Sequence, residues 1–215
     1  AFATKGIADA WSQVSGLVVQ PGIEFGPDEV FTMSKGANFG LREAISEYPE
    51  ICLEAHSTDF QPPETFATLA NMGFAFQKVG PALTFALRRA LYALDHIVQN
   101  LNPSAVSLPQ VMEAAMRDNP EYWKSHYSEK DISKWHSSYA DRIRYYWPLP
   151  AVKEAVDNLI LTFDTLKVSE HILEETFSSD VLERSQGLAA SRGRAIVRSE
   201  IQSALLPYFL GDHNA

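Results

Sequence analysis

Polar and ionisable side chains gather in one short stretch, residues 54–59, directly after a short apolar run. Glu54 and His56 stand two residues apart, so on a strand both side chains point to the same face. A carboxylate beside an imidazole can act as a general acid or base, or can bind a metal ion. The alternative is an ion pair that fixes the loop, with Thr58 or Asp59 capping the next turn. We predict that Glu54, His56 and Asp59 are catalytic, and that Glu54 and His56 are the ligands of any divalent metal ion.

The same pattern, an apolar run that ends in polar residues, occurs at two other places in the chain. Residues 17–19 are followed by Gln20 and Glu24, and residues 74–76 are followed by Lys78. In parallel sheets, ligands bind at the carboxyl ends of the strands. Lys78 is therefore predicted to be a fourth catalytic residue that polarises a substrate oxygen. Phosphate binding or an ion pair with the nearby carboxylate are its alternatives, and Glu24 is either a ligand or an ordinary loop carboxylate.

A phosphate site is predicted where residues 80–84 lead into a long helical pattern. The first N–H groups of a helix have no partner inside the helix, and small residues let a phosphate approach them. The alternative is an ordinary turn between a strand and a helix. The predicted substrate-binding and phosphate-binding residues are Gln20, Glu24, Ser57, Gly80, Ala82 and Thr84.

Helical patterns separate the three apolar runs, which predicts consecutive βα units. The expected strands are residues 17–20, 51–55 and 74–79; the expected helices are residues 2–15 with Ile7, Trp11 and Val14 on one face, a helix through 41–45, and residues 63–71 and 81–100. Right-handed crossovers make such strands parallel and bring their polar ends to one rim. Three strands are too few to close a barrel, so we expect further strands upstream.

The second half of the sequence predicts helices only. One helix is expected to start at Ser107, and others are expected over residues 150–166, 169–186 and 193–206. An aromatic segment, residues 139–148, lies between them and is rich in Tyr, Trp and Arg. Its side chains either pack within the protein or form a protein interface. We therefore predict βα units of a parallel sheet over residues 1–100 and a helical extension over residues 101–215.

Composition excludes several classes of partner. A net charge of −9 and a pI near 5.1 argue against nucleic acid and anionic membranes as partners. Arg192, Arg194 and Arg198 are predicted to form a solvated helix face. The single cysteine, Cys52, is expected to be a buried structural thiol in a reducing compartment. No apolar run approaches the ~20 residues of a membrane span, so a cytoplasmic location is expected.

Five strings of the chain are similar to one protein family. They are VVQPGIEF at residues 18–25, EAHSTDFQ at 54–61, KVGPALTFALR at 78–88, PEYW at 120–123 and DRIRYYWP at 141–148. Together they resemble the Z-type, non-catalytic subunit family of D-tagatose-1,6-bisphosphate aldolase, over about residues 1–160. The resemblance implies a (β/α)8 TIM barrel of which this chain supplies strands six to eight. It also implies carbohydrate metabolism, in the catabolism of galactitol, N-acetylgalactosamine or related alditols, with a sugar phosphate as substrate.

The resemblance implies three different roles. The family is described as a stabilising partner of the catalytic aldolase subunit, as a tagatose 6-phosphate kinase and as a tagatose 6-phosphate 4-epimerase. No GxxxxGK[ST] phosphate loop occurs in the sequence, which disfavours the kinase. The sixth-strand position, where related zinc aldolases carry a metal-binding histidine, resembles Gln20, which argues against zinc aldolase chemistry.

We predict a D-tagatose 6-phosphate 4-epimerase, because the inversion of a carbinol needs acid and base groups or a divalent metal ion, together with a phosphate anchor. The alternative is a non-catalytic stabilising subunit. In that interpretation, residues 139–148 dock on the catalytic aldolase subunit. A homo-oligomer is a further possibility for the partner.

Overall fold

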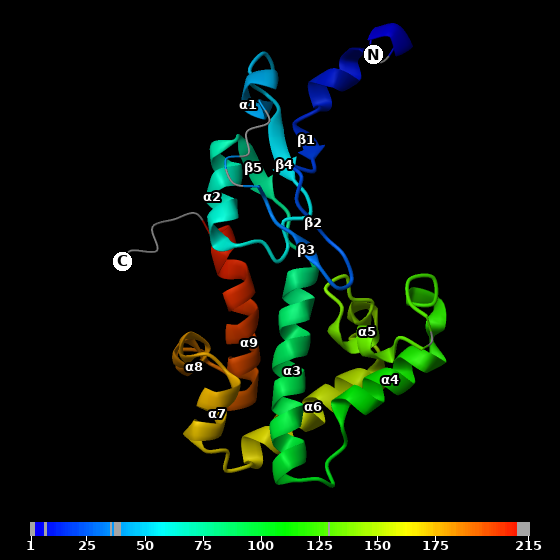
Figure 1. Ribbon diagram of the computed structural model, residues 1–215, viewed down its shortest axis with the longest axis vertical. Coiled ribbons are helices and arrows are strands. Elements are labelled where there is room, and N and C mark those ends of the chain that lie inside the picture. The colour runs from blue at the N-terminus through cyan, green and yellow to red at the C-terminus, as the bar shows by residue number, and fades with distance from the viewer. Residues whose placement is uncertain (1–2, 7, 35, 37–39, 129, 210–215) are drawn as a thin grey trace. The chain divides into compact units, whose positions relative to one another are not determined.

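The computed structural model describes residues 3–6, 8–34, 36, 40–128 and 130–209 (Figure 1). Contacts divide the chain into two compact units. The first unit comprises residues 1–25, 29–80 and 207–215, and the second comprises residues 26–28 and 81–206. The helix that begins at Pro81 thus belongs by its contacts to the second unit. The sequence predicts the boundary between βα units and helical extension at residue 100. A division by contacts does not test that boundary, which stays a prediction.

The first unit contains a parallel three-stranded sheet, which confirms an α/β architecture. Its strands are β1 (Gly16–Val19), β4 (Cys52–Ala55) and β5 (Phe74–Gln77), in the order β1-β4-β5. In the register, Val18 lies opposite Glu54, and Glu54 lies opposite Phe76. The carboxyl ends of the three strands therefore meet at one edge of the sheet, as the sequence predicted.

Two short helices accompany these strands. They are α1 (Leu41–Ala44) and α2 (Pro63–Asn71). Proline opens α2 because a first-turn residue needs no N–H donor. Gly73, at φ 97°, then reverses the chain into β5. The core of this unit consists of apolar side chains from the sheet, α2 and the loop after β1: Ile23, Leu53, Ala55, Leu69 and Phe74.

Two features of the first unit differ from the prediction. The loop after β1 contains an antiparallel hairpin, β2 (Glu24–Phe25) and β3 (Val30–Phe31). The expected helix over residues 2–15 is instead two 3-10 helices, η1 (Ala3–Lys5) and η2 (Ala8–Gln13), because Gly6 between them has φ 68°.

Two single residues also bear on the prediction. Ile7, expected on the apolar face of that helix, lies outside the described residues. Cys52 is half-buried rather than buried, since alternate residues of β4 point away from the core.

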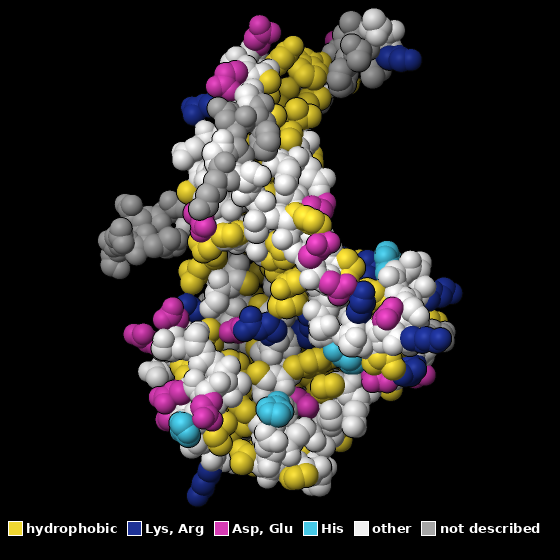
Figure 2. Space-filling view, viewed as in Figure 1, with side chains coloured by type: hydrophobic (Ala, Val, Ile, Leu, Met, Phe, Trp, Pro, Cys, Tyr) yellow, Lys and Arg dark blue, Asp and Glu magenta, His cyan; other side chains and the backbone are white. Residues whose placement is uncertain are grey.

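The outer strand β1 exposes apolar side chains. Leu17 is 49% exposed and Val18 is 53% exposed, although both belong to a strand of the sheet. Figure 2 shows hydrophobic side chains gathered around β1 on the face drawn. A parallel sheet normally has both faces covered, so this strand has a surface that the described residues leave open.

The second unit is helical. Its helices are α3 (Pro81–Leu101), α4 (Leu108–Asp118), α5 (Ile132–Ser137), α6 (Pro150–Thr165), α7 (Glu170–Thr176), α8 (Ser179–Gln186) and α9 (Arg192–Leu205), with the 3-10 helices η3 (Pro120–Tyr122) and η4 (Ile143–Tyr145). A last 3-10 helix, η5 (Leu206–Tyr208), connects this unit to the first. The predicted helix over 169–186 is two helices, because Ser178 caps α8 by accepting from the Val181 N–H. None of the helices in the described part of the chain is long and apolar enough to cross a membrane.

A buried ion pair ties α3 to the aromatic segment. The Arg88 guanidinium contacts the Asp141 carboxylate at 2.7 Å, with side-chain exposures of 2% and 0%. Arg88 also donates to the Ser138 carbonyl oxygen at 3.3 and 3.2 Å. Burial raises the pKa of Asp141 to about 6, against the charge of Arg88, which lowers it. Asp141 and its neighbours therefore pack into the unit, which is one of the two roles left open for residues 139–148.

Candidate functional site

The carboxyl end of β4 carries the closest acid/base pair of the first unit. Glu54 Oε1 and His56 Nε2 are 2.7 Å apart, and the two side chains are 35% and 31% exposed. In the neutral tautomer that carries its proton on Nε2, His56 donates to the Glu54 carboxylate and its Nδ1 atom is left as an acceptor. The His56 N–H donates to the Val19 carbonyl oxygen at 3.1 Å, which extends the β1-β4 ladder to this residue. The pair thus lies on one face of the strand end, as predicted, and is open to solvent.

The loops after β1 and β4 meet through three of the predicted substrate-binding residues. The Gln20 side chain donates to the Glu24 carboxylate and to Ser57 Oγ, the latter at 3.0 Å. The other oxygen of Glu24 accepts from the Phe25 N–H at 2.9 Å. Gln20, Glu24 and Ser57 therefore form one polar group at the rim, and part of the hydrogen-bonding capacity of Glu24 is used within its own loop.

Two buried side chains join the loop after β4 to the end of β5. Thr58, fully buried, donates to the Lys78 carbonyl oxygen at 2.5 Å. Asp59, 4% exposed, accepts from the Gly80 N–H at 2.9 Å. The two predicted loops are thus cross-connected, and the contact to Gly80 agrees with the capping role that was the alternative for Asp59.

The backbone of this loop has two unfavourable conformations. Ser57 has φ 59° and Phe60 has φ 63°, in the left-handed region that residues other than glycine rarely adopt. Such conformations cost about 1–3 kcal/mol each and persist where the surroundings determine them. They flank Thr58 and Asp59, so the turn that buries these two side chains is the strained one.

Lys78 presents its side chain to solvent. Within the part of the chain that the structure describes, its ammonium group forms no ion pair, so the expected alternative of a pair with Glu54 is not formed there. Its backbone is fixed, since the Lys78 N–H donates to the Ala55 carbonyl oxygen at 3.0 Å. The backbone of Lys78 is therefore fixed, while its ammonium group is exposed to solvent.

The predicted phosphate residues have different surroundings. The Gly80 N–H is already bound by the Asp59 carboxylate, so an anion there would compete with a negative group. Thr84, in the first turn of α3, donates its hydroxyl to the Pro81 carbonyl oxygen at 3.1 Å. Ala82 lies in the same turn, in the second unit. Phosphate binding by Gly80, Ala82 and Thr84 stays a prediction.

The described residues contain no group of three or more His, Cys, Asp or Glu side chains that could hold a metal ion. Glu54 and His56 offer one oxygen and one nitrogen ligand, which suits a divalent ion in kind but not in number. A divalent cofactor at this pair would therefore take its remaining ligands from the substrate, from water or from protein groups other than those described.

Sequence reasoning missed Tyr208, which contacts the site from the other end of the chain. Its hydroxyl lies 3.1 Å from Thr58 Oγ1, and its ring packs on Phe66 with centroids 4.4 Å apart. Since Thr58 donates to the Lys78 carbonyl oxygen, Tyr208 is the donor to Thr58. Burial raises the pKa of Tyr208, which keeps this donor protonated. No local signal marks this residue, because the contact spans 150 positions of the sequence.

The parallel sheet, with carboxylate, imidazole and hydroxyl groups at the carboxyl ends of its strands, defines the chain as an α/β protein with a polar rim. The chain belongs to the D-tagatose-1,6-bisphosphate aldolase subunit GatZ/KbaZ-like family, which matches residues 1–212. The match extends beyond the 160 residues over which the resemblance was expected. The family description names a D-tagatose-1,6-bisphosphate aldolase subunit, which confirms the predicted family.

A solved structure supports the same assignment. The crystal structure of a probable tagatose 6 phosphate kinase from Sinorhizobium meliloti 1021 is similar to this chain with a TM-score of 0.83 and 38% sequence identity. The similarity covers 96% of this chain and 55% of that structure. The chain therefore spans about half the length of the solved relative.

Proposed function

We propose that the complete protein is a D-tagatose 6-phosphate 4-epimerase. The observation that carries the proposal is the Glu54–His56 pair, whose atoms lie 2.7 Å apart at a solvent-accessible strand end. Inversion at C4 by acid/base chemistry removes a proton from the substrate and returns one, which requires positioned acid and base groups. With Nε2 bound to Glu54, the His56 Nδ1 atom is the base, and Glu54 stabilises the imidazolium that forms.

The remaining predicted residues have supporting roles in this proposal. Lys78, exposed at the end of β5, polarises a substrate oxygen, and Asp59 fixes the turn at Gly80. Residues 80–84 anchor the phosphate, with Ala82 and Thr84 in the first turn of α3. The substrate hydroxyls bind Gln20, Glu24 and Ser57, which already form one hydrogen-bonded group. In the alternative form of the proposal, Glu54 and His56 would hold a divalent ion in place of acting as the acid/base pair, and that ion would polarise the substrate oxygens.

The proposal includes the fold of the complete protein, in which β1, β4 and β5 are strands six to eight of a (β/α)8 TIM barrel. Two observations support it. The chain covers 55% of the solved relative, and the exposed side chains of β1 leave a surface for a further strand or helix.

Two other roles are weighed against the epimerase. The solved relative is named a probable tagatose 6 phosphate kinase, but the sequence contains no GxxxxGK[ST] loop, so a kinase is not proposed. The family description names an aldolase subunit. A stabilising subunit needs a docking surface and no acid/base pair, so it accounts less well for the pair at the rim.

The test is an assay of the complete purified protein with D-tagatose 6-phosphate, in which D-fructose 6-phosphate is measured by a coupled enzyme. One arm contains no nucleotide, a second contains ATP, and each is run with and without a divalent metal ion. Turnover without ATP supports the epimerase. ADP release that depends on tagatose 6-phosphate supports a kinase, and no reaction in any arm contradicts both.

A further inference from the structure

A cluster of tyrosine and arginine side chains on the second unit shares no residue with those proposed for catalysis. Tyr122 is 44% exposed and Tyr145 is 39% exposed, and their rings stack with centroids 5.1 Å apart and planes at 17°. The guanidinium groups of Arg142 and Arg144 lie 4.7 and 5.1 Å from the centre of the Tyr145 ring. We call these four residues the Tyr–Arg cluster.

The cluster is held in place by the chain beneath it. Arg142 Nε donates to the Tyr122 carbonyl oxygen at 2.7 Å. The Tyr122 ring meets the fully buried Tyr146 ring edge-on, with centroids 5.8 Å apart, and the Tyr146 hydroxyl donates to the Asn119 carbonyl oxygen. A surface whose side chains are already ordered loses little conformational entropy when a partner binds.

The charges of Arg142 and Arg144 both lower the pKa of Asp141, but neither guanidinium is paired with it. Among the described residues, neither Arg142 nor Arg144 forms an ion pair, whereas the exposed Arg117, Arg192 and Arg194 each pair with a carboxylate. The nearest candidate in the sequence, Asp141, is taken by the buried Arg88. The chain as a whole carries a net charge of −9, so two guanidinium groups over one tyrosine ring contrast with its acidic character.

This composition is typical of a protein interface. Tyrosine and arginine are the residues most enriched where truncation weakens binding, because they combine a large contact area with directed hydrogen bonds. Figure 2 shows further Lys and Arg side chains over the α4 and α5 part of the second unit, on the face drawn. Asp and Glu side chains lie among them, and Arg117 and Lys134 pair with Glu113 and Asp28. The attraction for an acidic partner is therefore assigned to Arg142 and Arg144, and it acts mainly on the association rate.

We propose that the Tyr–Arg cluster is the docking surface for a carboxylate-rich patch of a partner protein, with Arg142 and Arg144 pairing with its acidic side chains. The family description names an aldolase subunit, so the partner to test first is the catalytic subunit of a D-tagatose-1,6-bisphosphate aldolase. The proposal is independent of the epimerase activity, since the cluster shares no residue with the rim.

The experiment measures the dissociation constant of the complete protein for that purified catalytic subunit by calorimetry, at low and high salt. The variants are Arg142→Glu with Arg144→Glu, Arg144→Glu alone, and Tyr145→Ala; the control is Arg198→Glu, which reverses an exposed charge on α9. We expect the double variant to weaken binding at least about tenfold and the control to change it less than about twofold. Wild-type binding should also weaken as salt rises.

Several outcomes would overturn the proposal. These are an absence of binding by the wild type, an equal loss in the control, or unchanged binding in Tyr145→Ala and Arg144→Glu, which leave the Arg142 contact with Tyr122 intact. Light scattering of the protein alone tests whether the surface binds a second copy of the chain. If the wild type is a dimer and the double variant is a monomer, the surface belongs to that dimer and the proposal is overturned. Tagatose 6-phosphate turnover of the variants, expected to be unchanged, keeps failure of this proposal separate from failure of the epimerase.

Discussion

The two units use charged and polar side chains in opposite ways. In the first unit, Glu54 and His56 form a pair that is about one-third exposed, at the end of a four-residue strand. In the second unit, Arg88 and Asp141 form a pair at the same distance that is almost fully buried. The exposed pair can exchange protons with a substrate, whereas the buried pair holds a helix and a loop together. Burial, rather than the distance between the charges, therefore distinguishes the two pairs.

The largest expected effect is on the reaction itself. His56→Gln keeps a donor for Glu54 but removes the base, so turnover of D-tagatose 6-phosphate is expected to fall by about 10²- to 10⁴-fold. His171→Gln, which changes a 79% exposed histidine on α7, is the control and should leave turnover unchanged. Steady-state rates of the complete protein decide the matter, and an active His56→Gln protein would remove the pair from the mechanism.

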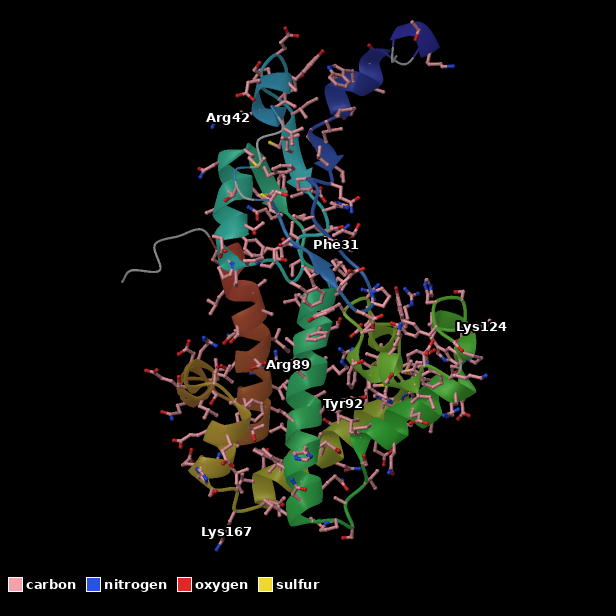
Figure 3. All side chains as sticks on the ribbon, viewed as in Figure 1. Phe31, Arg42, Arg89, Tyr92, Lys124 and Lys167 are labelled. Atoms are coloured by element: carbon pink, nitrogen blue, oxygen red, sulfur yellow. The ribbon has the colours of Figure 1, made fainter. Side chains whose placement is uncertain are left out.

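The buried pair should dominate stability. Arg88→Met leaves the Asp141 carboxylate buried without its partner, and the free energy of unfolding is expected to fall by about 3–5 kcal/mol. Arg89, the next residue on α3 (Figure 3), is 65% exposed and pairs with Glu200 at 3.1 Å. Arg89→Met is expected to cost less than about 1 kcal/mol. Denaturant unfolding of both variants measures the difference, and equal losses would show that burial of the pair has no special weight.

A smaller effect is expected where Tyr208 supports the loop after β4. Tyr208→Phe keeps the ring on Phe66 and removes only the donor to Thr58. A hydrogen bond of this kind contributes about 0.5–1.5 kcal/mol to stability. Because Thr58 also bonds the Lys78 carbonyl oxygen, the kcat of the proposed epimerase reaction should fall several-fold.

A matched comparison separates that effect from a general loss of stability. Tyr48→Phe changes an exposed tyrosine of the same unit, whose ring centroid lies 5.5 Å from that of Trp11. If both variants lowered kcat equally, Tyr208 would have no particular connection to the rim.

The smallest effect concerns pH. Tyr92, on α3 (Figure 3), bonds His136 Nδ1 at 2.7 Å, and burial lowers the pKa of His136; Glu113 at 3.9 Å opposes this shift and Arg88 adds to it. As pH falls through 6.5, the unfolded chain therefore takes up the proton before the folded chain does. Stability is lost below pH 6.5, by at most about 1.4 kcal/mol per pH unit for this one proton.

The measurement is the free energy of unfolding between pH 7.5 and pH 5. His136→Gln should reduce its decline over this range, while His126→Gln, a change at an exposed histidine, should not. A decline of the same slope in His136→Gln would assign the pH dependence to other groups.

The sequence predicted the parts of the rim that depend on local pattern. Apolar runs that end in polar residues identified the three parallel strands, and the two-residue period placed Glu54 and His56 on one face. The hairpin of β2 and β3 was missed because strands of two residues carry no periodic signal. The contact between Tyr208 and Thr58 and the pair of Arg88 and Asp141 join distant parts of the chain, and no local rule indicates which of many polar residues will meet.

The strained turn at Ser57 and Phe60 has a consequence for the evolution of this family. Glycine would adopt both conformations without the steric cost, so a lineage under selection for stability alone is expected to replace these residues. A lineage that retains larger side chains there is less stable, but keeps the backbone that places Thr58 and Asp59. The residue types at these two positions therefore indicate, organism by organism, whether natural selection still maintains the rim.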